Sequence, residues 1–319
     1  MPRFDVTTIG EGNLRLSVPA GEQLEHATNL NLAVAGAEGN VAGALAHLGW
    51  QTGWVSKLPQ TSLAKRVLNT YKLAGLDTSA VCFSKDERLA TLFVEYAAKP
   101  RVTNVIFDRQ YSAFSQLTRS DVNWEYLLDT RLIHLTGITA ALSDQTRTVL
   151  VELVARAKQA GVAISFDVNY REKLWSLADA RAVLMPLVDG ANLLFCSQAD
   201  AARVFGCAAS ANDSLLKLAK LTNAKHIVMS CADQGILAWN GQQILKSPAK
   251  EVEMIDRIGA GDGLAAGVLH GYLHGDFVKG LEFGCIMAAL AISQFGEMVL
   301  TTDEELEALS LNEHQDIVR

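Results

Sequence analysis

Asp256 opens the stretch of the sequence whose residue types are best suited to chemistry. It is followed by the turn Gly259-Ala260-Gly261, by Asp262, and by an apolar run that predicts a helix. Small residues at 259–261 let backbone N–H groups approach an anion, and the helix N-terminus adds its partial positive charge. A carboxylate in this first turn is most simply a cap, but beside an anion hole it would repel phosphate unless it accepts a proton. The stretch therefore predicts phosphoryl transfer, with Gly259, Ala260 and Gly261 as the anion hole and Asp262 as the base for an attacking hydroxyl.

The elements that must position this turn alternate between apolar runs and helix-like stretches. The runs cover 131–138, 162–169, 191–197 and 225–232, and the helix-like stretches between and around them cover 144–160, 178–189, 199–206 and 212–222. This alternation predicts parallel strands that crossover helices cover on both faces. Ligands bind such sheets beyond the carboxyl ends of the strands, so the polar residues that end the runs are candidates for the site. These residues are Thr136, Asp167, Asn169, Ser197 and Ser230.

Three further segments, 14–19, 90–97 and 103–109, have the alternation expected of antiparallel strands. We expect them to form a small sheet over the mouth of the crevice. The sequence shows no repeat and no flexible linker. We therefore predict a single domain over 1–319 with a lid formed by about 12–34 and 88–112.

Charge and composition limit the class of protein. With 28 basic and 35 acidic residues the formal charge is −7, which does not favour a nucleic-acid or acidic-membrane partner. The N-terminal residues lack the pattern of a signal peptide, and no apolar stretch approaches a membrane span. The five cysteines are scattered without a CxxC pair, as expected in a reducing compartment. These observations predict a cytoplasmic protein.

Other catalytic and binding motifs fail on their spacing. Gly10-Glu-Gly12 follows an apolar run, but Arg15 stands where a dinucleotide-binding motif needs its third glycine. The sequence contains no GxxxxGK[ST] motif, which excludes a P-loop enzyme. His270 and His274 have a zinc-like spacing, yet no glutamate lies between them and no third ligand is evident.

The segment DRIGAGDGLAAG, residues 256–267, resembles the C-terminal signature of the ribokinase-like (PfkB) carbohydrate kinases. Arg257 and Gly263 stand where threonine and alanine or serine are common in that family. The resemblance implies a three-layer α/β/α fold with a mostly parallel central sheet and a small β-sheet lid. It also implies ATP and Mg²⁺ as cofactors, Asp262 as the catalytic base, and Asp256 close to the phosphates and the metal through water.

Three other segments resemble motifs of the same family. Residues 36–42 resemble its N-terminal sugar-contacting motif, with Ala35 in place of the first glycine, which implies that Gly36 and Asn40 bind substrate. Residues 197–200 stand where the family has N-x-x-E, which implies that Asp200 acts on magnesium through water. Residues 230–235 resemble its nucleotide turn, with Ala232 replacing a glycine. The implied nucleotide-binding residues are Ser197, Ser230, Gly235 and Gly261.

Within the family, the segments 134–143 and 167–176 most resemble 2-keto-3-deoxygluconate kinases. A carboxylate substrate favours arginine, whose planar fork binds both oxygens. We therefore predict Arg171, after the strand-ending DVNY, and Arg109, at the end of a lid strand, as carboxylate ligands. Alternation along that strand places Asp108 on the opposite side. Tyr96 and Asn169 complete the predicted substrate site.

Two other functions stay open at this stage: a kinase for a neutral sugar such as fructose, and a non-catalytic sensor, which the changes at Ser197, Asp200 and Ala232 would suit. An exposed sheet edge and apolar face on the lid would need covering. We therefore also predict a homodimer packed lid to lid.

Overall fold

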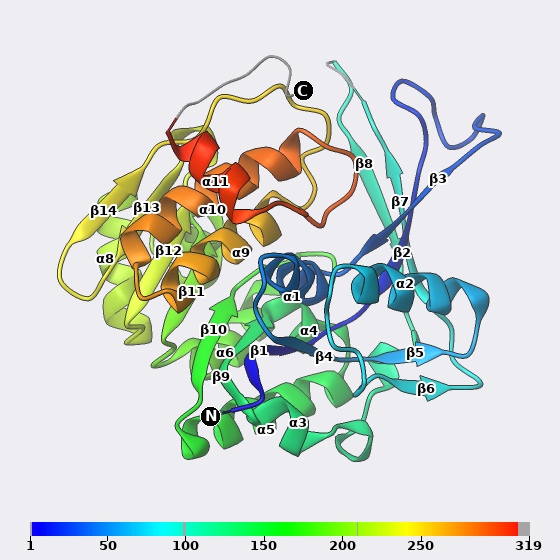
Figure 1. The fold of residues 1–319 in the computed structure, drawn as a ribbon, viewed down its shortest axis with the longest axis horizontal. Coiled ribbons are helices and arrows are strands. Elements are labelled where there is room, and N and C mark those ends of the chain that lie inside the picture. Colours follow the sequence, from blue (N-terminus) through cyan, green and yellow to red (C-terminus); the bar gives the residue numbers. More distant parts are fainter. Residues whose placement is uncertain (1, 98–99, 209, 312–319) are drawn as a thin grey trace.

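The computed structural model describes residues 2–97, 100–208 and 210–311. Its largest sheet has eight strands in the order β14-β13-β12-β11-β10-β9-β1-β4 (Figure 1). The strands are β1 (Phe4–Ile9), β4 (Thr52–Val55), β9 (Thr130–Thr136), β10 (Ala163–Asp167), β11 (Leu193–Ser197), β12 (His226–Ser230), β13 (Ile236–Trp239) and β14 (Ile244–Ser247). The six strands from β4 to β12 are parallel, and only β13 and β14 run antiparallel to their neighbours.

Helices cover both faces of this sheet because its strands carry apolar side chains on both sides. On β9, Ile133 and Leu135 belong to one buried cluster, while Leu132 belongs to the cluster on the opposite face. The first cluster contains side chains of α3 (Trp124–Leu128), α5 (Asp144–Ala160), α6 (Leu177–Val188), α7 (Gln198–Phe205) and α8 (Ala211–Thr222). The second contains side chains of α1 (Ala37–His47), α9 (Ala260–Leu273), α10 (Phe277–Ile292) and α11 (Asp303–Ser310). The three-layer α/β/α arrangement predicted from the sequence is confirmed.

Local signals explain where these helices begin and end. The Ser143 hydroxyl caps α5 by accepting a bond from the Thr146 N–H, and Gly161 ends the helix in the left-handed conformation. Helix α9 lies unusually close to α10, since a Cβ added at Gly267 would stand 2.5 Å from the Phe283 carbonyl oxygen. This glycine contact lets α9 pack closely on α10, and the N-terminus of α9 carries Asp262.

A separate four-stranded sheet, called the small sheet below, projects beside the main one at the upper right of Figure 1. Its order is β3-β2-β7-β8, with bounds β2 (Asn13–Ser17), β3 (Asn31–Ala35), β7 (Ala90–Glu95) and β8 (Asn104–Asp108). Strands β7 and β8 are antiparallel, as expected, but β2 pairs with β7 in parallel, so the expectation of a purely antiparallel sheet was wrong. Strand β3 was not predicted; it adds the outer antiparallel partner of β2.

The remaining elements are short or peripheral. They are α2 (Ser62–Leu73), α4 (Gly137–Leu142), the paired strands β5 (Lys57–Pro59) and β6 (Cys82–Ser84), and the 3-10 turns η1 (Phe114–Gln116), η2 (Arg119–Asp121) and η3 (Ala232–Gln234). Among the described residues, no helix combines the length and the apolar character that crossing a bilayer requires.

Candidate active site

A cleft of about 1060 Å³ lies between the small sheet, the carboxyl ends of β10, β11 and β12, and the N-terminus of α9. Many of the residues predicted from the sequence line it: Gly36, Arg109, Asn169, Arg171, Ser197, Asp200, Ser230, Gly259, Ala260, Gly261 and Asp262. The cleft therefore lies where parallel sheets bind their ligands, beyond the carboxyl ends of the strands.

The turn before α9 has a backbone that only glycine fits at its first position. Gly259 has φ +97°, and an added Cβ would stand 2.7 Å from the carbonyl oxygen of Glu297. At Gly261 an added Cβ would meet no atom within 4 Å, so this side of the turn is open to the cleft. The first-turn N–H groups of α9 have no acceptor within the helix. The turn has the open backbone that the predicted anion hole requires, and its binding of an anion stays a prediction.

Asp262 is partly buried in the first turn of α9, and its carboxylate faces Asn40. The Asn40 Nδ2 donates to Asp262 Oδ2 at 2.8 Å. Burial raises the pKa of Asp262 well above its usual range, the Asn40 bond opposes this rise, and the charges of Glu297 and Asp167 add to it. A carboxylate with a raised pKa binds a proton more readily, which suits the predicted general base.

Besides Thr136, four predicted residues lie outside the lining of the cleft. Asn40 is buried behind Asp262 and contacts its carboxylate. Gly235 is buried against β14, where an added Cβ would lie 2.3 Å from the Ser247 carbonyl oxygen. Tyr96 and Asp256 bond to each other, the Tyr96 hydroxyl donating to Asp256 Oδ2 at 2.7 Å. Asp256 is only 1% exposed, so the structure gives no support to the predicted water-mediated metal contact through this residue.

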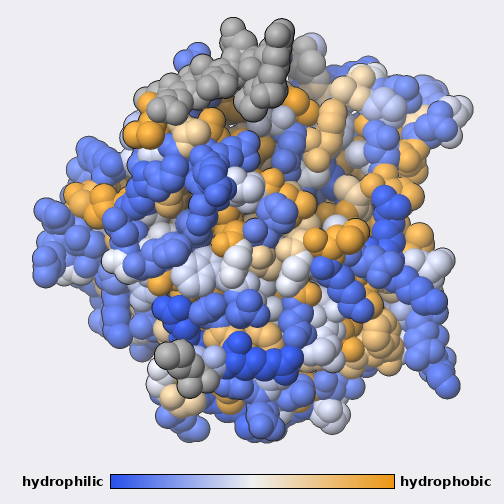
Figure 2. Space-filling model, viewed as in Figure 1, coloured by the Kyte–Doolittle hydropathy of each residue, from blue (hydrophilic) through white to orange (hydrophobic). Residues whose placement is uncertain are grey.

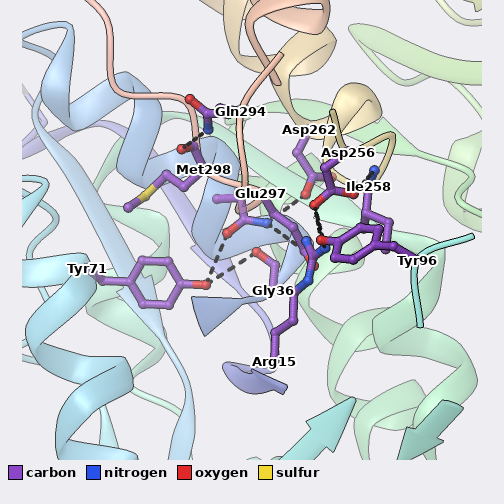
Figure 3. Close-up of polar contacts among 11 residues, drawn as sticks. Arg15, Gly36, Tyr71, Tyr96, Asp256, Ile258, Asp262, Gln294, Glu297 and Met298 are labelled. Carbon is purple, nitrogen blue, oxygen red and sulfur yellow. Dashed lines mark hydrogen bonds and ion pairs between the residues drawn. The ribbon is translucent and has the colours of Figure 1, made fainter. Parts of the chain in front are cut away.

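Sequence reasoning missed the charged partners of Asp256. Arg15 of β2 is 1% exposed and forms ion pairs with Asp256 and, at 3.3 Å, with Glu297. Figure 3 shows the Arg15 side chain between Glu297 on one side and Asp256 with Tyr96 on the other. Arg15 was considered only as the residue that breaks a glycine motif, and Glu297 was not considered. A charged residue within an apolar, strand-like run was the signal that could have identified Arg15.

A second pair of acidic residues, Asp167 and Asp200, lies at the carboxyl ends of β10 and β11. Burial raises the pKa of Asp167 to about 7, with Arg171 opposing the rise and Asp200 adding to it. The pKa of Asp200 is also raised by burial, while its bond with Ser197 and the charge of Arg171 oppose the rise. Oxygen ligands of this kind suit Mg²⁺, so Asp167 joins the predicted Asp200 as a candidate for holding the metal.

Asn169 offers a hydrogen-bond acceptor that the described part of the chain leaves unused. Its backbone has φ +42°, and its N–H and Nδ2 donate to Asp167 at 3.1 and 3.3 Å. These bonds turn the amide so that Oδ1 is buried with no partner among the described residues. A buried polar atom is rarely left unpaired, so this oxygen is available to a substrate hydroxyl in the cleft.

The two predicted arginines differ in their surroundings. The Arg109 Nε and Nη2 donate to Glu11 Oε2 at 2.9 and 2.6 Å, and Ser112 bonds the other oxygen of Glu11. Arg171 is exposed in the cleft, where, among the described residues, its Nη1 donates only to the neighbouring Tyr170 carbonyl oxygen at 3.0 Å. Arg171 is therefore the freer of the two guanidinium groups for an anionic substrate. Glu11 was missed, although a glutamate two residues after a buried strand was a signal for it.

Alternation along β8 separates Asp108 from Arg109. Asp108 is exposed and forms an ion pair with Arg88, whereas Arg109 is buried. Thr136, considered because it ends β9, instead donates to buried Glu38 at 2.7 Å. It therefore supports the wall of the cleft and does not line it.

The structure supplies the third ligand that the histidine pair lacked, because Asp303 lies beside His270 and His274. The Trp50 Nε1 donates to His270 Nδ1 at 3.0 Å, and His270 Nε2 lies 3.2 Å from Asp303. A neutral ring that accepts at Nδ1 carries its proton on Nε2, so it has no lone pair to give a metal there. No third ligand was evident from the sequence because Asp303 lies far from the histidines along the chain, and the hydrogen bonding favours a structural role for these histidines.

Comparisons with known proteins agree with this geometry. The model of the pfkB family of carbohydrate kinases matches residues 3–303. The chain is 33% identical over 304 residues to a 2-dehydro-3-deoxygalactonokinase of Haloferax volcanii, with 95% of each chain covered. It is 29% identical over 310 residues to a 2-dehydro-3-deoxygluconokinase of Bacillus subtilis, covering 95% of this chain and 94% of the relative.

A solved structure gives the same result for the fold. The crystal structure of a 2-dehydro-3-deoxygluconokinase from Thermotoga maritima superposes with a TM-score of 0.92 at 28% identity, covering 97% of this chain and 99% of the other. The matched family model spans most of the chain, and the cleft is lined by the glycine turn and the aspartate that were predicted from the sequence. The chain is a sugar kinase that belongs to the pfkB family of carbohydrate kinases, with the ribokinase-like fold expected from its sequence.

Proposed function

We propose that this sugar kinase transfers the γ-phosphoryl group of ATP to 2-keto-3-deoxygluconate, forming its 6-phosphate. The observation that carries the proposal is the exposed guanidinium of Arg171, which lines the same cleft as Asp262. A planar guanidinium binds a carboxylate through two parallel hydrogen bonds. A neutral sugar has no carboxylate to accept them. The names of the relatives from Bacillus subtilis and Thermotoga maritima support the same substrate.

In the proposed reaction, Asp262 accepts the proton of the primary hydroxyl of the sugar acid. The hydroxyl oxygen attacks the γ-phosphorus of ATP as the bond between that phosphorus and ADP breaks. The first-turn N–H groups at Ala260 and Gly261 stabilise the charge on the moving phosphoryl group. Mg²⁺ would be held near Asp200 and Asp167, where its charge offsets that of the phosphates. Raised pKa values at these carboxyls fit a site that is completed by a cation.

The rest of the proposed substrate site surrounds the sugar chain. The Asn169 Oδ1, which has no partner among the described residues, accepts a bond from a hydroxyl, and Gly36 allows the sugar to approach the backbone. Glu11 and Arg109 form a neutral buried pair at the small-sheet side of the cleft. We propose that this pair binds hydroxyl groups of the sugar, so that Arg171 alone supplies the main contact to the carboxylate. For the nucleotide we retain Ser197 and Ser230 as ligands.

A second candidate substrate is 2-keto-3-deoxygalactonate, which differs only in the configuration of one hydroxyl carbon. The Haloferax volcanii relative named for this substrate is 33% identical, and the Bacillus subtilis relative is 29% identical. Arg171 and Asp262 would serve both epimers equally, since neither contacts that carbon in the proposed pose. The choice between epimers then depends on the hydroxyl contacts of Asn169 and Glu11.

We also propose that two copies of the chain pair through their small sheets. Leu32 on β3, with Ile106 and Phe107 on β8, is exposed, and these strands form the two edges of the small sheet. Figure 2 shows hydrophobic residues along the small sheet, whereas hydrophilic residues cover most of the surface over α10 and α11. Exposed apolar strands at a sheet edge favour pairing with another chain. A monomer at micromolar concentration in light scattering would refute this arrangement.

The experiment that tests the function measures ATP consumption by the purified protein with Mg²⁺. The acceptors are the two 2-keto-3-deoxy acids, fructose and ribose, with Asp262→Asn as the inactive control. Turnover on a keto acid that the substitution abolishes supports both the base and the carboxylate site. Turnover only on a neutral sugar refutes the carboxylate site. A folded wild-type protein that consumes no ATP with any of them refutes the proposed substrate and favours a sensor.

A further inference from the structure

The buried cation Arg15 links the small sheet to both ends of the loop that carries the candidate anion hole: it pairs with Asp256 at the start, and it reaches Asp262 at the end through other side chains. We propose that Arg15 is a positioning residue for phosphoryl transfer: it sets the place of the glycine turn and of Asp262 without touching the reacting groups. The inference rests on the proposed kinase chemistry of this cleft.

The first connection runs from Arg15 to the start of the loop. Its guanidinium pairs with the Asp256 carboxylate, which also accepts the Ile258 N–H at 3.0 Å on its other oxygen. The N–H groups of Ile255 and Asp256 in turn donate to the Ile292 carbonyl oxygen at 2.9 and 3.0 Å. The residues immediately before the glycine turn are therefore held by the side chain of Asp256, and Asp256 is held by Arg15.

The second connection runs from Arg15 through Glu297 and Asn40 to Asp262, at the end of the loop. Its Nη1 lies 3.3 Å from Glu297 Oε1, and the other oxygen of Glu297 accepts from Asn40 Nδ2, also at 3.3 Å. The same Asn40 nitrogen donates to Asp262. The backbone of Glu297 also packs on Gly259, closely enough to exclude any side chain there. Arg15 thus reaches the base through Glu297 and Asn40, while it reaches the turn through Asp256.

Charge explains why the cation is needed. Asp256 and Glu297 are both buried, and Arg15 is the basic side chain that pairs with them in the described part of the chain. Two buried carboxylates without a cation repel each other and move apart or take up protons. Arginine suits the position because its fork reaches two carboxylates from one side chain, which a lysine ammonium does less well.

The position of Arg15 in the fold makes the loop depend on the small sheet. Arg15 lies in the middle of β2 and pairs in register with Leu92 of β7. Tyr96, just after β7, bonds both Arg15 and Asp256. A displacement of the small sheet would therefore pull on Asp256 and Glu297 together. The catalytic arrangement is expected only when the small sheet stands where the structure has it.

The test compares Arg15→Gln with Arg66→Gln. The control is matched because Arg66 also joins the body to the small sheet, through an exposed bond at 3.2 Å from its Nη2 to the Leu32 carbonyl oxygen. Loss of positioning lowers kcat rather than substrate binding, so we expect Arg15→Gln to lower kcat about 100-fold with little change in KM. Arg66→Gln should keep its kcat. Free guanidinium should restore part of the activity of Arg15→Ala and none to Asp262→Asn.

A second variant and a second readout keep the inference testable if Arg15→Gln does not fold. Glu297→Gln keeps the shape and the Asn40 contact but removes the ion pair, and it should lower kcat about tenfold. Backbone hydrogen exchange in wild type and variant reports on residues 256–264 without any substrate. Exchange there should rise in Arg15→Gln and stay unchanged in β10.

These readouts separate the two proposals. A wild-type protein with no activity on any acceptor, but with loop exchange that depends on Arg15, would defeat the proposed substrate and leave the positioning role standing. A folded Arg15→Gln or Glu297→Gln protein with kcat within about threefold of wild type would overturn the positioning role. The same conclusion follows if KM rises and kcat is kept, or if Arg66→Gln loses as much activity.

Discussion

Replacing Asn40 by alanine should shift the pH dependence of the enzyme, because Asn40 holds the ionised form of the candidate base. Its Nδ2 donates to Asp262 Oδ2 at 2.8 Å and lowers the pKa of a carboxyl that burial has raised. A hydrogen bond to a charged group is worth about 1.5–3 kcal/mol, which corresponds to about a 10- to 150-fold change in an ionisation equilibrium. Asn40→Ala should therefore need a higher pH before Asp262 ionises, and kcat/KM at neutral pH should fall by that factor.

The assay is the pH profile of kcat/KM for the wild type, Asn40→Ala and Tyr71→Phe. The base acts only when it is deprotonated, so activity rises with pH through the pKa of Asp262. In Asn40→Ala this rise should move to higher pH, and the deficit should shrink once both proteins are ionised. Tyr71 contacts Asn40 Oδ1 at 3.4 Å but has no bond to Asp262, so Tyr71→Phe should change the profile little. An equal loss at every pH would refute this reasoning and favour the direct substrate contact predicted from the sequence.

Three further predictions follow from the same cleft. Gly259→Ala places a side chain at φ +97° and 2.7 Å from the Glu297 carbonyl oxygen. The variant should therefore lose about 1–3 kcal/mol of stability, which urea unfolding measures, and most of its kcat, which a turnover assay measures. Arg171→Met should raise KM for the keto acid about 10- to 100-fold. Because Arg171 lowers the pKa of Asp262, the substitution should also move the acid limb of the pH profile of kcat/KM to higher pH. An unchanged KM would show that Arg171 does not bind the carboxylate. Because the folded-state pKa of Asp167 is raised from 3.8 to about 7, its proton stabilises the folded state below this range and that stability is lost as the pH rises through it. Asp167→Asn lacks this titration. In urea unfolding, the free energy of unfolding of the wild type should therefore fall relative to that of the variant by up to about 1.4 kcal/mol per pH unit, up to neutral pH. Parallel curves of stability against pH would contradict the raised pKa.

Sequence patterns predicted the main sheet well because its signals are local. The run 162–169 is apolar and the stretch 144–160 has a serine before it and a glycine after it, which mark the ends of α5. Strand β3 was missed because 31–35 is short and half exposed, so its period is weak. Its pairing with β2, and the parallel pairing of β2 with β7, depend on chain segments far apart in sequence.

The site was predictable where one short motif contains both the turn and its chemistry, as at 259–262. It was not predictable where a side chain's partner comes from another part of the chain. Arg109 was expected to face an anionic substrate, but Glu11 already pairs with it, and Tyr96 was expected over the sugar but bonds Asp256. The sequence near Arg109 and Tyr96 does not identify the residues with which they pair. A buried charge calls for a partner of opposite sign, but sequence alone does not say which one it meets.

The long separation between the two halves of the site has a consequence for synthesis on the ribosome. Asn40 and Asp262 are 222 residues apart, and Arg15 and Glu297 are 282 apart. All eight strands of the main sheet are complete by Ser247, before any residue of the glycine turn has been translated. The strands therefore leave the exit tunnel before α9 and α10, so the apolar face that these two helices cover stays exposed until they follow. The candidate base and anion hole emerge after the sheet, and the contact of Glu297 with Asn40 forms later still, once α10 has also left the exit tunnel.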